Sequence, residues 1–269
     1  MAQAAPEYDA YQSSFHEAFR AELYGIIEDL PAARLVLDAP CGNGFYTRRL
    51  AERLGSGGRL IAIDSNDEYL RSTRAGVGGR KDAVEVLKAD AYSLPFETAT
   101  FDLVWCAQSL ISLDPGRAVR EMFRVVKHDG VVAILEVDEF HRVLLPWPPE
   151  LEAAIPRAVY EASVCKYGDA VKLAPSRKLR AILGAAGFGS IRRTTYPFDR
   201  AAPFDPLAAA FLAHHFEYLR SLTFAYLPAP MRNLFDRVTD AAAADSLYHL
   251  PDAELVCINA VYLATPGRS

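Results

Sequence analysis

A strand, a glycine turn and the start of a helix follow one another within residues 34–47, and this order constrains the fold strongly. Residues 35–37 are apolar, and so short a run is typical of a parallel strand covered on both faces. Because Gly42 and Gly44 lack a Cβ atom, the backbone of the turn can lie against a ligand. A dinucleotide fingerprint would need a third glycine where this chain has Thr47. The stretch therefore predicts a nucleotide-like ligand other than NAD or FAD.

The composition indicates a globular protein with a small-molecule partner. With 269 residues, 51% of them hydrophobic, the chain can bury one large core or a core with an elaborated cap. The net charge of -5, with Lys and Arg scattered among acids, gives no electrostatic reason to expect nucleic acid. No apolar run approaches the roughly 18 residues of a membrane span, and the start does not resemble a signal peptide. We therefore expect no membrane partner.

The four cysteines indicate a reducing compartment. They contain no C-x-x-C pair, and Cys41 and Cys106 fall inside apolar sequence, as reduced buried thiols do. We therefore expect a cytoplasmic protein. The sequence leaves its oligomeric state open, a homo-oligomer included.

Asp64 ends the second predicted strand, residues 60–63. It lies about 20 residues beyond the glycine turn, the interval at which nucleoside-binding βαβ units place an acid that accepts hydrogen bonds from two ribose hydroxyls. Such a residue could instead cap a helix, but Ser65 with Glu68 predicts a capping box for the helix that follows. Asp64 is therefore predicted to bind ribose, with Ser65 and Asn66 beside the ribose or the adenine.

Asp90 stands just beyond a third predicted strand, residues 84–87. A lone aspartate here would be an ordinary turn residue. A fourth strand is predicted over 101–106, and open α/β sheets bind ligands at the carboxyl ends of such strands. We therefore predict that Asp38, Asp64 and Asp90 share one cleft.

These segments resemble class I S-adenosylmethionine-dependent methyltransferases. Residues 38–44, Asp-Ala-Pro-Cys-Gly-Asn-Gly, are similar to the first motif of that family, an acid followed by x-G-x-G-x-G, with Pro40 in place of the first glycine. Residues 89–96 resemble the G-D-A-x-x-L-P-F motif of the branch that includes ubiquinone and menaquinone biosynthesis enzymes, and residues 101–104 match its F-D-x-V segment. The resemblance implies an α/β fold, a doubly wound seven-stranded Rossmann-like sheet with a mainly helical cap.

The resemblance also implies S-adenosyl-L-methionine as the cofactor. Asp90 would accept the adenine amino group, and the backbone N–H of Ala91 would meet the ring. The backbone carbonyls of Cys106 and Ala107 would accept the ammonium of the methionine part, whose carboxylate suits the positive end of the helix after the glycine turn. Gln108 would face the cofactor or the substrate. The residues predicted to bind the cofactor are Tyr11, Asp38, Ala39, Pro40, Cys41, Gly42, Gly44, Asp64, Ser65, Asn66, Asp90, Ala91, Cys106, Ala107 and Gln108.

The remaining segments are predicted to form the cap. In the family a leading segment often folds over the cofactor, which would put Tyr8 or Tyr11 near it, although both tyrosines could equally staple their own helix. The predicted parts are an N-terminal cap helix (1–32), the core (33–143, continued at 176–200 and in a final strand at 252–269), a lid segment (144–175) and a helical cap insertion (201–251).

The expected reaction is in-line transfer of a methyl group to a small-molecule acceptor, such as a secondary metabolite or a quinone-like compound. Holding donor and acceptor together in a dry pocket can supply much of the catalysis. Where the acceptor needs a base, the candidates are His141, His214 and His215. A metal site at Glu136, Asp138, Glu139 and His141 is not expected, because their spacing matches no recognised ligand set.

Three other functions stay open. The domain could use S-adenosylmethionine for a reaction that transfers no methyl group, it could be a non-catalytic partner subunit, or its acceptor could be a protein. An enclosing aromatic cap would suit a small acceptor better than a peptide chain.

Overall fold

The computed structural model describes residues 6–80, 82–137, 143–168 and 175–267, and the chain divides into two compact units. The sheet unit comprises Ala21–Val137, Pro175–Tyr196 and Asn259–Ser269. The helical unit comprises Met1–Arg20, Asp138–Ala174 and Pro197–Ile258. The predicted binding residues other than Tyr11 all belong to the sheet unit.

Parallel strands form the centre of the sheet. Their order is β3-β2-β1-β4-β5, from β1 (Leu35–Asp38), β2 (Arg59–Asp64), β3 (Val84–Lys88), β4 (Phe101–Ala107) and β5 (Val126–Val137). The antiparallel β8 (Glu254–Pro266) follows β5 and also pairs with β7 (Phe188–Ala201) and with β6 (Val143–Leu144). The predicted α/β class is confirmed. The described residues form eight strands instead of seven because the two-residue β6, which has no apolar run of its own, joins the edge of β8.

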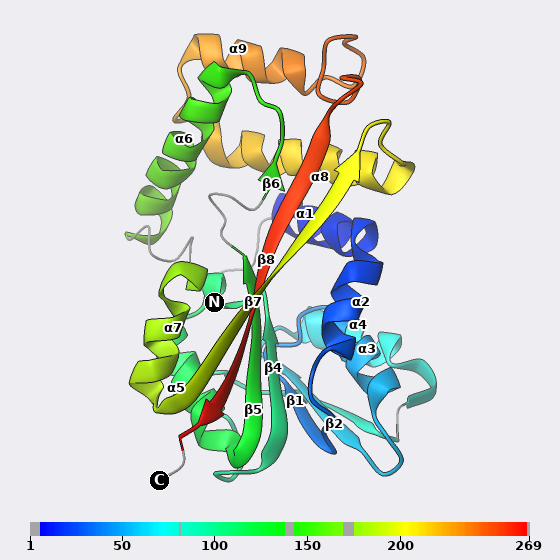
Figure 1. Ribbon diagram of the computed structural model, residues 1–269, viewed down its shortest axis with the longest axis vertical. Helices are drawn as coiled ribbons and strands as arrows, with labels where there is room; N and C mark the ends of the chain where they lie inside the picture. The colour runs from blue at the N-terminus through cyan, green and yellow to red at the C-terminus, as the bar shows by residue number, and fades with distance from the viewer. Residues whose placement is uncertain (1–5, 81, 138–142, 169–174, 268–269) are drawn as a thin grey trace. The chain divides into compact units, whose positions relative to one another are not determined.

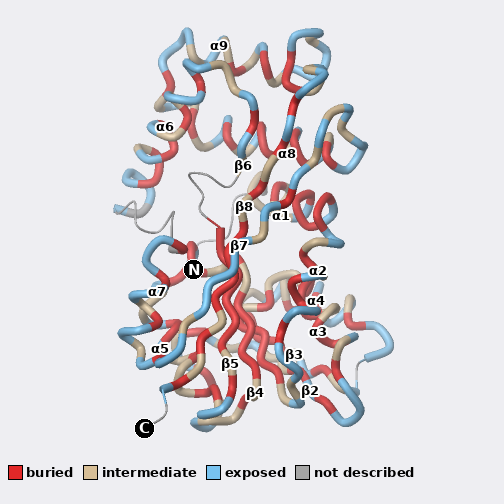
Figure 2. The backbone as a smooth tube through the Cα atoms, viewed as in Figure 1, coloured by how far each residue is buried: buried red, intermediate tan, exposed pale blue. Residues whose placement is uncertain are grey.

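Helices cover both faces of this sheet (Figure 1). One face carries α2 (Arg20–Glu28), α3 (Phe45–Arg53) and α4 (Asp67–Gly76), and the other carries α5 (Pro115–Val125) and α7 (Pro175–Ala186). Two short 3-10 helices, η1 (Gly78–Arg80) and η2 (Leu110–Ser112), lie in the connections. Because the central strands are covered on both sides, β1 and β4 are mostly buried (Figure 2), which is why they read as apolar runs in the sequence.

The helical unit contains α1 (Pro6–Ala18), α6 (Pro149–Tyr167), α8 (Pro206–Thr223) and α9 (Ala229–Val238). Asp205 caps α8, because its side chain accepts the Ala208 N–H at 2.8 Å and Pro206 occupies the first helical position. Phe15, Phe19 and Phe211 are fully buried and pack ring on ring. No helix within the described ranges combines the length and the apolar character that crossing a membrane requires.

The segment 1–32 was predicted as one N-terminal cap helix, and its described residues form two helices. α1 ends at Ala18 and α2 begins at Arg20, and the division between the two units falls directly after Arg20. Phe15 is buried in the helical unit, whereas Ile26 is buried in the sheet unit. The apolar pattern runs on without interruption because both segments are helical, although they contribute to different cores.

Candidate functional site

The carboxyl ends of β1, β2 and β3 bring the three predicted aspartates to one edge of the sheet. Asp38 is the last residue of β1, and Asp64, the last residue of β2, lies in register with Lys88 at the end of β3. Asp90 follows two residues later and is exposed, with its Oδ1 accepting the Tyr92 N–H at 2.9 Å. Since β2 lies between β1 and β3, the three aspartates lie at the same edge of the sheet, the edge at which open α/β sheets bind ligands.

Asp64 ties the glycine turn to the second strand. Its Oδ2 accepts the Gly42 N–H at 3.1 Å, and its Oδ1 accepts the Asn66 N–H at 2.9 Å. Burial raises the pKa of Asp64, and the backbone N–H groups oppose that rise. Each carboxylate oxygen can accept more than one hydrogen bond, so Asp64 can hold the turn and still receive ligand hydroxyls.

The predicted capping box at Ser65 and Glu68 is wrong by one residue. Asn66 is the N-cap of α4, and its side-chain oxygen accepts the Glu68 N–H at 2.8 Å. Asp64 also takes part in the start of this helix, since its carboxylate accepts the backbone N–H of Asn66. Helix boundaries defined by single hydroxyl or amide groups shift easily by one position, because Ser and Asn are both favourable caps.

Two hydroxyl groups of α4 hold the other side of the turn. Thr73 Oγ1 donates to the Gly42 carbonyl at 3.0 Å, and Ser72 Oγ donates to the Asn43 carbonyl at 3.1 Å. Sequence reasoning missed both, since they lie 31 and 29 residues from their partners and no local pattern connects them. With its carbonyls bound to α4, the turn has a fixed conformation at the sheet edge.

Gly42 of the turn leaves open space beside its backbone. Gly42 has φ +53°, and a Cβ atom built on it meets no described atom within 4 Å. The open space beside Gly42 fits a cofactor lying against the backbone. Cys41, next to it, is a buried thiol whose pKa is raised by burial.

Asp38 points into the protein and is held there by Thr47. Thr47 Oγ1, in the first turn of α3, donates to Asp38 Oδ2 at 2.6 Å, and both side chains are buried. Burial raises the pKa of Asp38 from its ordinary 3.8 to about 7, the Thr47 hydrogen bond opposes that rise, and the Asp64 charge adds to it. Sequence analysis used Thr47 only to exclude a dinucleotide. The sequence signal for the Thr47–Asp38 hydrogen bond was the position of Thr47 in the helix that follows Asp38 at the end of its strand.

Replacing Asp38 by asparagine should flatten the dependence of stability on pH. Because the pKa of Asp38 is higher in the folded than in the unfolded chain, the native state binds more protons between 3.8 and about 7, and the free energy of unfolding falls as pH rises through that window. The wild type should therefore lose about 2–4 kcal/mol relative to Asp38→Asn between about pH 4 and about pH 8. Thermal melts of both proteins across this range test the prediction, and parallel pH profiles would contradict it.

The end of β4 lies beside Asp38, since Asp38 and Trp105 are in register. Cys106 is fully buried, and the Ala107 carbonyl accepts Ser109 Oγ at 2.8 Å. Gln108 has φ +51°, a backbone conformation that non-glycine residues rarely adopt and that is enriched at functional sites.

The buried Glu136 of β5 stabilises the turn after β4. Its Oε1 accepts the backbone N–H groups of Ser109 and Leu110 at 3.1 and 2.8 Å. These bonds fix the start of η2 and therefore the backbone that carries Gln108. Glu136 therefore supports the local backbone of this turn.

In the division of the chain, Tyr11, His214 and His215 belong to the helical unit. Tyr11 is buried in the helical unit, with its ring 4.9 Å from Tyr218, and His215 of α8 is buried 5.4 Å from Tyr11. His214 is half-buried on the same helix. His141, with Asp138 and Glu139, falls outside the described residues. The catalytic and cofactor roles of Tyr11, His214 and His215 remain predictions.

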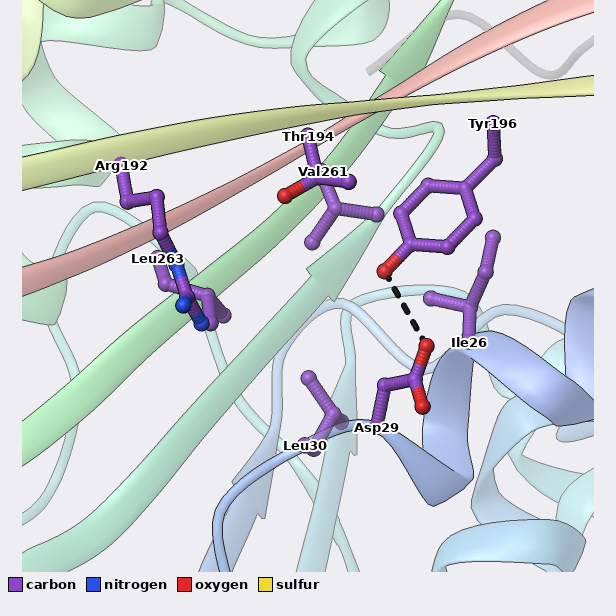
Figure 3. A pocket seen from close by; sticks show the side chains of 8 residues that line it. All are labelled: Ile26, Asp29, Leu30, Arg192, Thr194, Tyr196, Val261 and Leu263. Carbon is purple, nitrogen blue, oxygen red and sulfur yellow. Dashed lines mark hydrogen bonds between the residues drawn. The ribbon is translucent and has the colours of Figure 1, made fainter.

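Within the described ranges, no group of three or more His, Cys, Asp or Glu residues is placed to hold a metal ion. A cavity of about 300 Å³ lies elsewhere in the sheet unit, between α2 and the adjacent faces of β7 and β8 (Figure 3). Tyr196 points across this cavity and donates from its hydroxyl to Asp29 Oδ2 at 3.3 Å. The side chains that line it are Ile26, Asp29, Leu30, Arg192, Thr194, Tyr196, Val261 and Leu263. None comes from β1, β2 or β3, so the cavity is separate from the aspartate edge.

Known proteins are similar to the part of the chain that contains Asp38, Asp64 and Asp90. Residues 37–134 match the family model described as a methyltransferase domain. The demethylmenaquinone methyltransferase of Bacillus cereus (strain ATCC 10987 / NRS 248) is 34% identical over 139 residues, which cover 49% of this chain and 58% of that protein. The chain therefore spans little more than half the length of this relative.

Two solved structures share the fold. The phosphoethanolamine N-methyltransferase 2 of Haemonchus contortus, in complex with phosphomonomethylethanolamine and S-adenosylhomocysteine, aligns with a TM-score of 0.56 at 17% identity over 98% of this chain and 59% of that one. The cyclase SpnF aligns with a TM-score of 0.54 at 19% identity over 92% of this chain and 82% of that one. At these identities the likeness concerns the fold alone. Residues 37–134 match a methyltransferase domain, and this match confirms the resemblance to S-adenosylmethionine-dependent methyltransferases.

Proposed function

We propose that the chain is an S-adenosylmethionine-dependent methyltransferase that methylates a small-molecule acceptor. The observation that carries the proposal is the Asp64 carboxylate, which accepts the Gly42 N–H at 3.1 Å on the edge that also holds Asp38 and Asp90. A carboxylate at the end of the second strand can accept hydrogen bonds from ribose hydroxyls, and its bond to the glycine turn keeps the turn backbone next to that ribose. The methyltransferase domain over 37–134 contains all of these residues.

Each part of the edge would bind a different part of the cofactor. Asp64, with Ser65 and Asn66, would bind the ribose, and Asp90, with the Ala91 N–H, would bind the adenine. The carbonyls of Cys106 and Ala107 would accept the ammonium of the methionine part. The open space beside Gly42 supports this assignment, because the turn offers its backbone without a side chain in between.

For this reaction the protein mainly has to position the cofactor and the acceptor. Bound S-adenosylmethionine supplies a methyl group on a positively charged sulfur, and the neutral thioether that leaves needs no acid. The chain would hold the acceptor in line with the methyl group and exclude water, a source of about 7–11 kcal/mol in favourable cases. Where the acceptor must lose a proton, His141, His214 and His215 remain the candidate bases.

The proposal also includes a cap, a cofactor contact from Tyr11 and a location. The assignment of 1–32, 144–175 and 201–251 to a cap is a prediction, as is Tyr11 as a cofactor contact. A cytoplasmic location agrees with Cys41, Cys106 and Cys257, which are buried as free cysteines.

Product analysis tests the proposed function. The protein is incubated with S-adenosylmethionine and a panel of small aromatic and aliphatic acceptors, and mass spectrometry follows both cofactor and acceptor. We expect S-adenosylhomocysteine to form in step with an acceptor that gains one methyl group. Conversion of an acceptor while S-adenosylmethionine stays intact would contradict methyl transfer and would favour a rearrangement reaction of the kind implied by the name of the cyclase SpnF.

A further inference from the structure

Asn259 is a fully buried polar side chain that has no hydrogen-bond partner among the described residues. It lies in β8 at 0% exposure, and neither its Oδ1 nor its Nδ2 bonds to any residue that the structure describes. An amide buried without partners costs free energy, and buried amides in native proteins are almost always paired. An unpaired buried amide therefore calls for a functional explanation.

The sheet register places Asn259 at the edge where ligands bind. Asn259 is paired with Val137, the last residue of β5, two positions beyond the pair formed by Leu135 and Val261. Leu135 in turn is paired with Ala107, the last residue of β4. Asn259 therefore extends past the carboxyl end of β4, where open α/β sheets receive ligands.

The same register places Asn259 on the face of Asp38. Asp38 is in register with Trp105, and Trp105 with Ala133, so these side chains share one face of the sheet. Val137 lies four residues after Ala133 on β5 and faces the same way, as does its partner Asn259. The unpaired amide and the proposed cofactor residues therefore belong to the same face.

We propose that Asn259 binds the methyl acceptor through a neutral group that both donates and accepts a hydrogen bond, such as a phenol, an alcohol or a lactam. An amide offers a donor and an acceptor without charge, so one hydroxyl or lactam can satisfy both atoms. Val137, Val261 and Leu135 surround Asn259 on its sheet face, and all are buried. A charged ligand group would lose its hydration there without a countercharge. The inference rests on the proposed function, whose acceptor it restricts to a chemical class.

The substitution Asn259→Leu tests the proposal, because leucine keeps the size of the side chain and removes its polar atoms. The probes are 1-naphthol, 1-naphthoate and 1-naphthylmethylamine, which share a ring system and differ in charge. Calorimetry measures the binding of each to the protein saturated with S-adenosylhomocysteine. We expect 1-naphthol to bind the wild type more tightly than the two ions, and to bind Asn259→Leu roughly tenfold or more weakly. The variant should keep the affinity for S-adenosylhomocysteine and a Tm at or above that of the wild type, since it removes an unpaired amide.

Ser246→Ala is the matched control. Ser246 is also fully buried, its Oγ has no partner among the described residues, and it lies in the helical unit. This variant should bind 1-naphthol like the wild type. Equal binding of 1-naphthol to Asn259→Leu and wild type, tighter binding of either ion, or no binding of 1-naphthol would overturn the inference. A wild type that fails to bind S-adenosylhomocysteine would overturn the proposed function, and the inference with it.

Discussion

Replacing Asp64 by alanine should weaken the binding of S-adenosylhomocysteine by about 1.5–3 kcal/mol, roughly a 10- to 150-fold increase in Kd. The carboxylate is largely buried, and its hydrogen bonds to ribose hydroxyls would be charge-assisted, which makes them stronger than neutral ones. Alanine also removes the acceptors for the N–H groups of Gly42 and Asn66, so the turn would lose part of its support. Both losses act in the same direction. Titration calorimetry measures the effect.

Asp67→Asn is the control for the Asp64 experiment. Asp67 lies three residues away at the start of α4, is exposed, and its carboxylate contacts Lys88 Nζ at 2.6 Å. The Lys88 ammonium, which donates a hydrogen bond and lies close, keeps the pKa of Asp67 below its ordinary value. A surface pair of this kind contributes little to stability, and Asp67 has no proposed contact with the cofactor. Asp67→Asn should therefore bind S-adenosylhomocysteine like the wild type. If Asp64→Ala does so too, the assignment of the cofactor site is wrong.

The sheet could be predicted from the sequence because its strands carry their own signals. β1, β2 and β4 are buried on both faces, so each reads as a short apolar run that ends near a polar or small residue. Parallel strands place their carboxyl ends together, so the order of Asp38, Asp64 and Asp90 along the chain already predicted their common edge. The two-residue β6 had no such signal.

The contacts that shape the site could not be predicted in the same way. Thr73 and Ser72 reach the glycine turn only because α4 packs beside it, and nothing near either residue in the sequence marks the partner. Asn259 looks like one polar residue among the otherwise apolar residues 255–264. Its interest comes from complete burial without a hydrogen-bond partner in the described part of the chain, which only the packed structure shows. Local periodicity predicts elements, whereas these properties arise between elements.

Gly44→Ala should cost about 2–5 kcal/mol of unfolding free energy, the largest effect on stability that we expect in the turn. Gly44 has φ +82°, which costs an alanine about 1–2 kcal/mol. A Cβ atom there would also lie 2.9 Å from Thr73 Cα and 2.8 Å from Thr73 Oγ1. The first of these is a backbone atom of α4, so relief requires the turn and the helix to separate, at a further cost of about 1–3 kcal/mol. Chemical denaturation measures the loss.

Gly42→Ala makes the comparison decisive, because it introduces the same methyl group into the same turn without the clash. Gly42 also has positive φ, so the variant should lose about 1–2 kcal/mol, but its Cβ meets no described atom within 4 Å. That open space is where the proposed cofactor would lie against the backbone. Gly42→Ala should therefore reduce the affinity for S-adenosylhomocysteine far more than its modest loss of stability accounts for. Equal stability of the two variants would show that α4 does not restrain the turn, and an unchanged affinity in Gly42→Ala would mean that the cofactor does not approach this backbone.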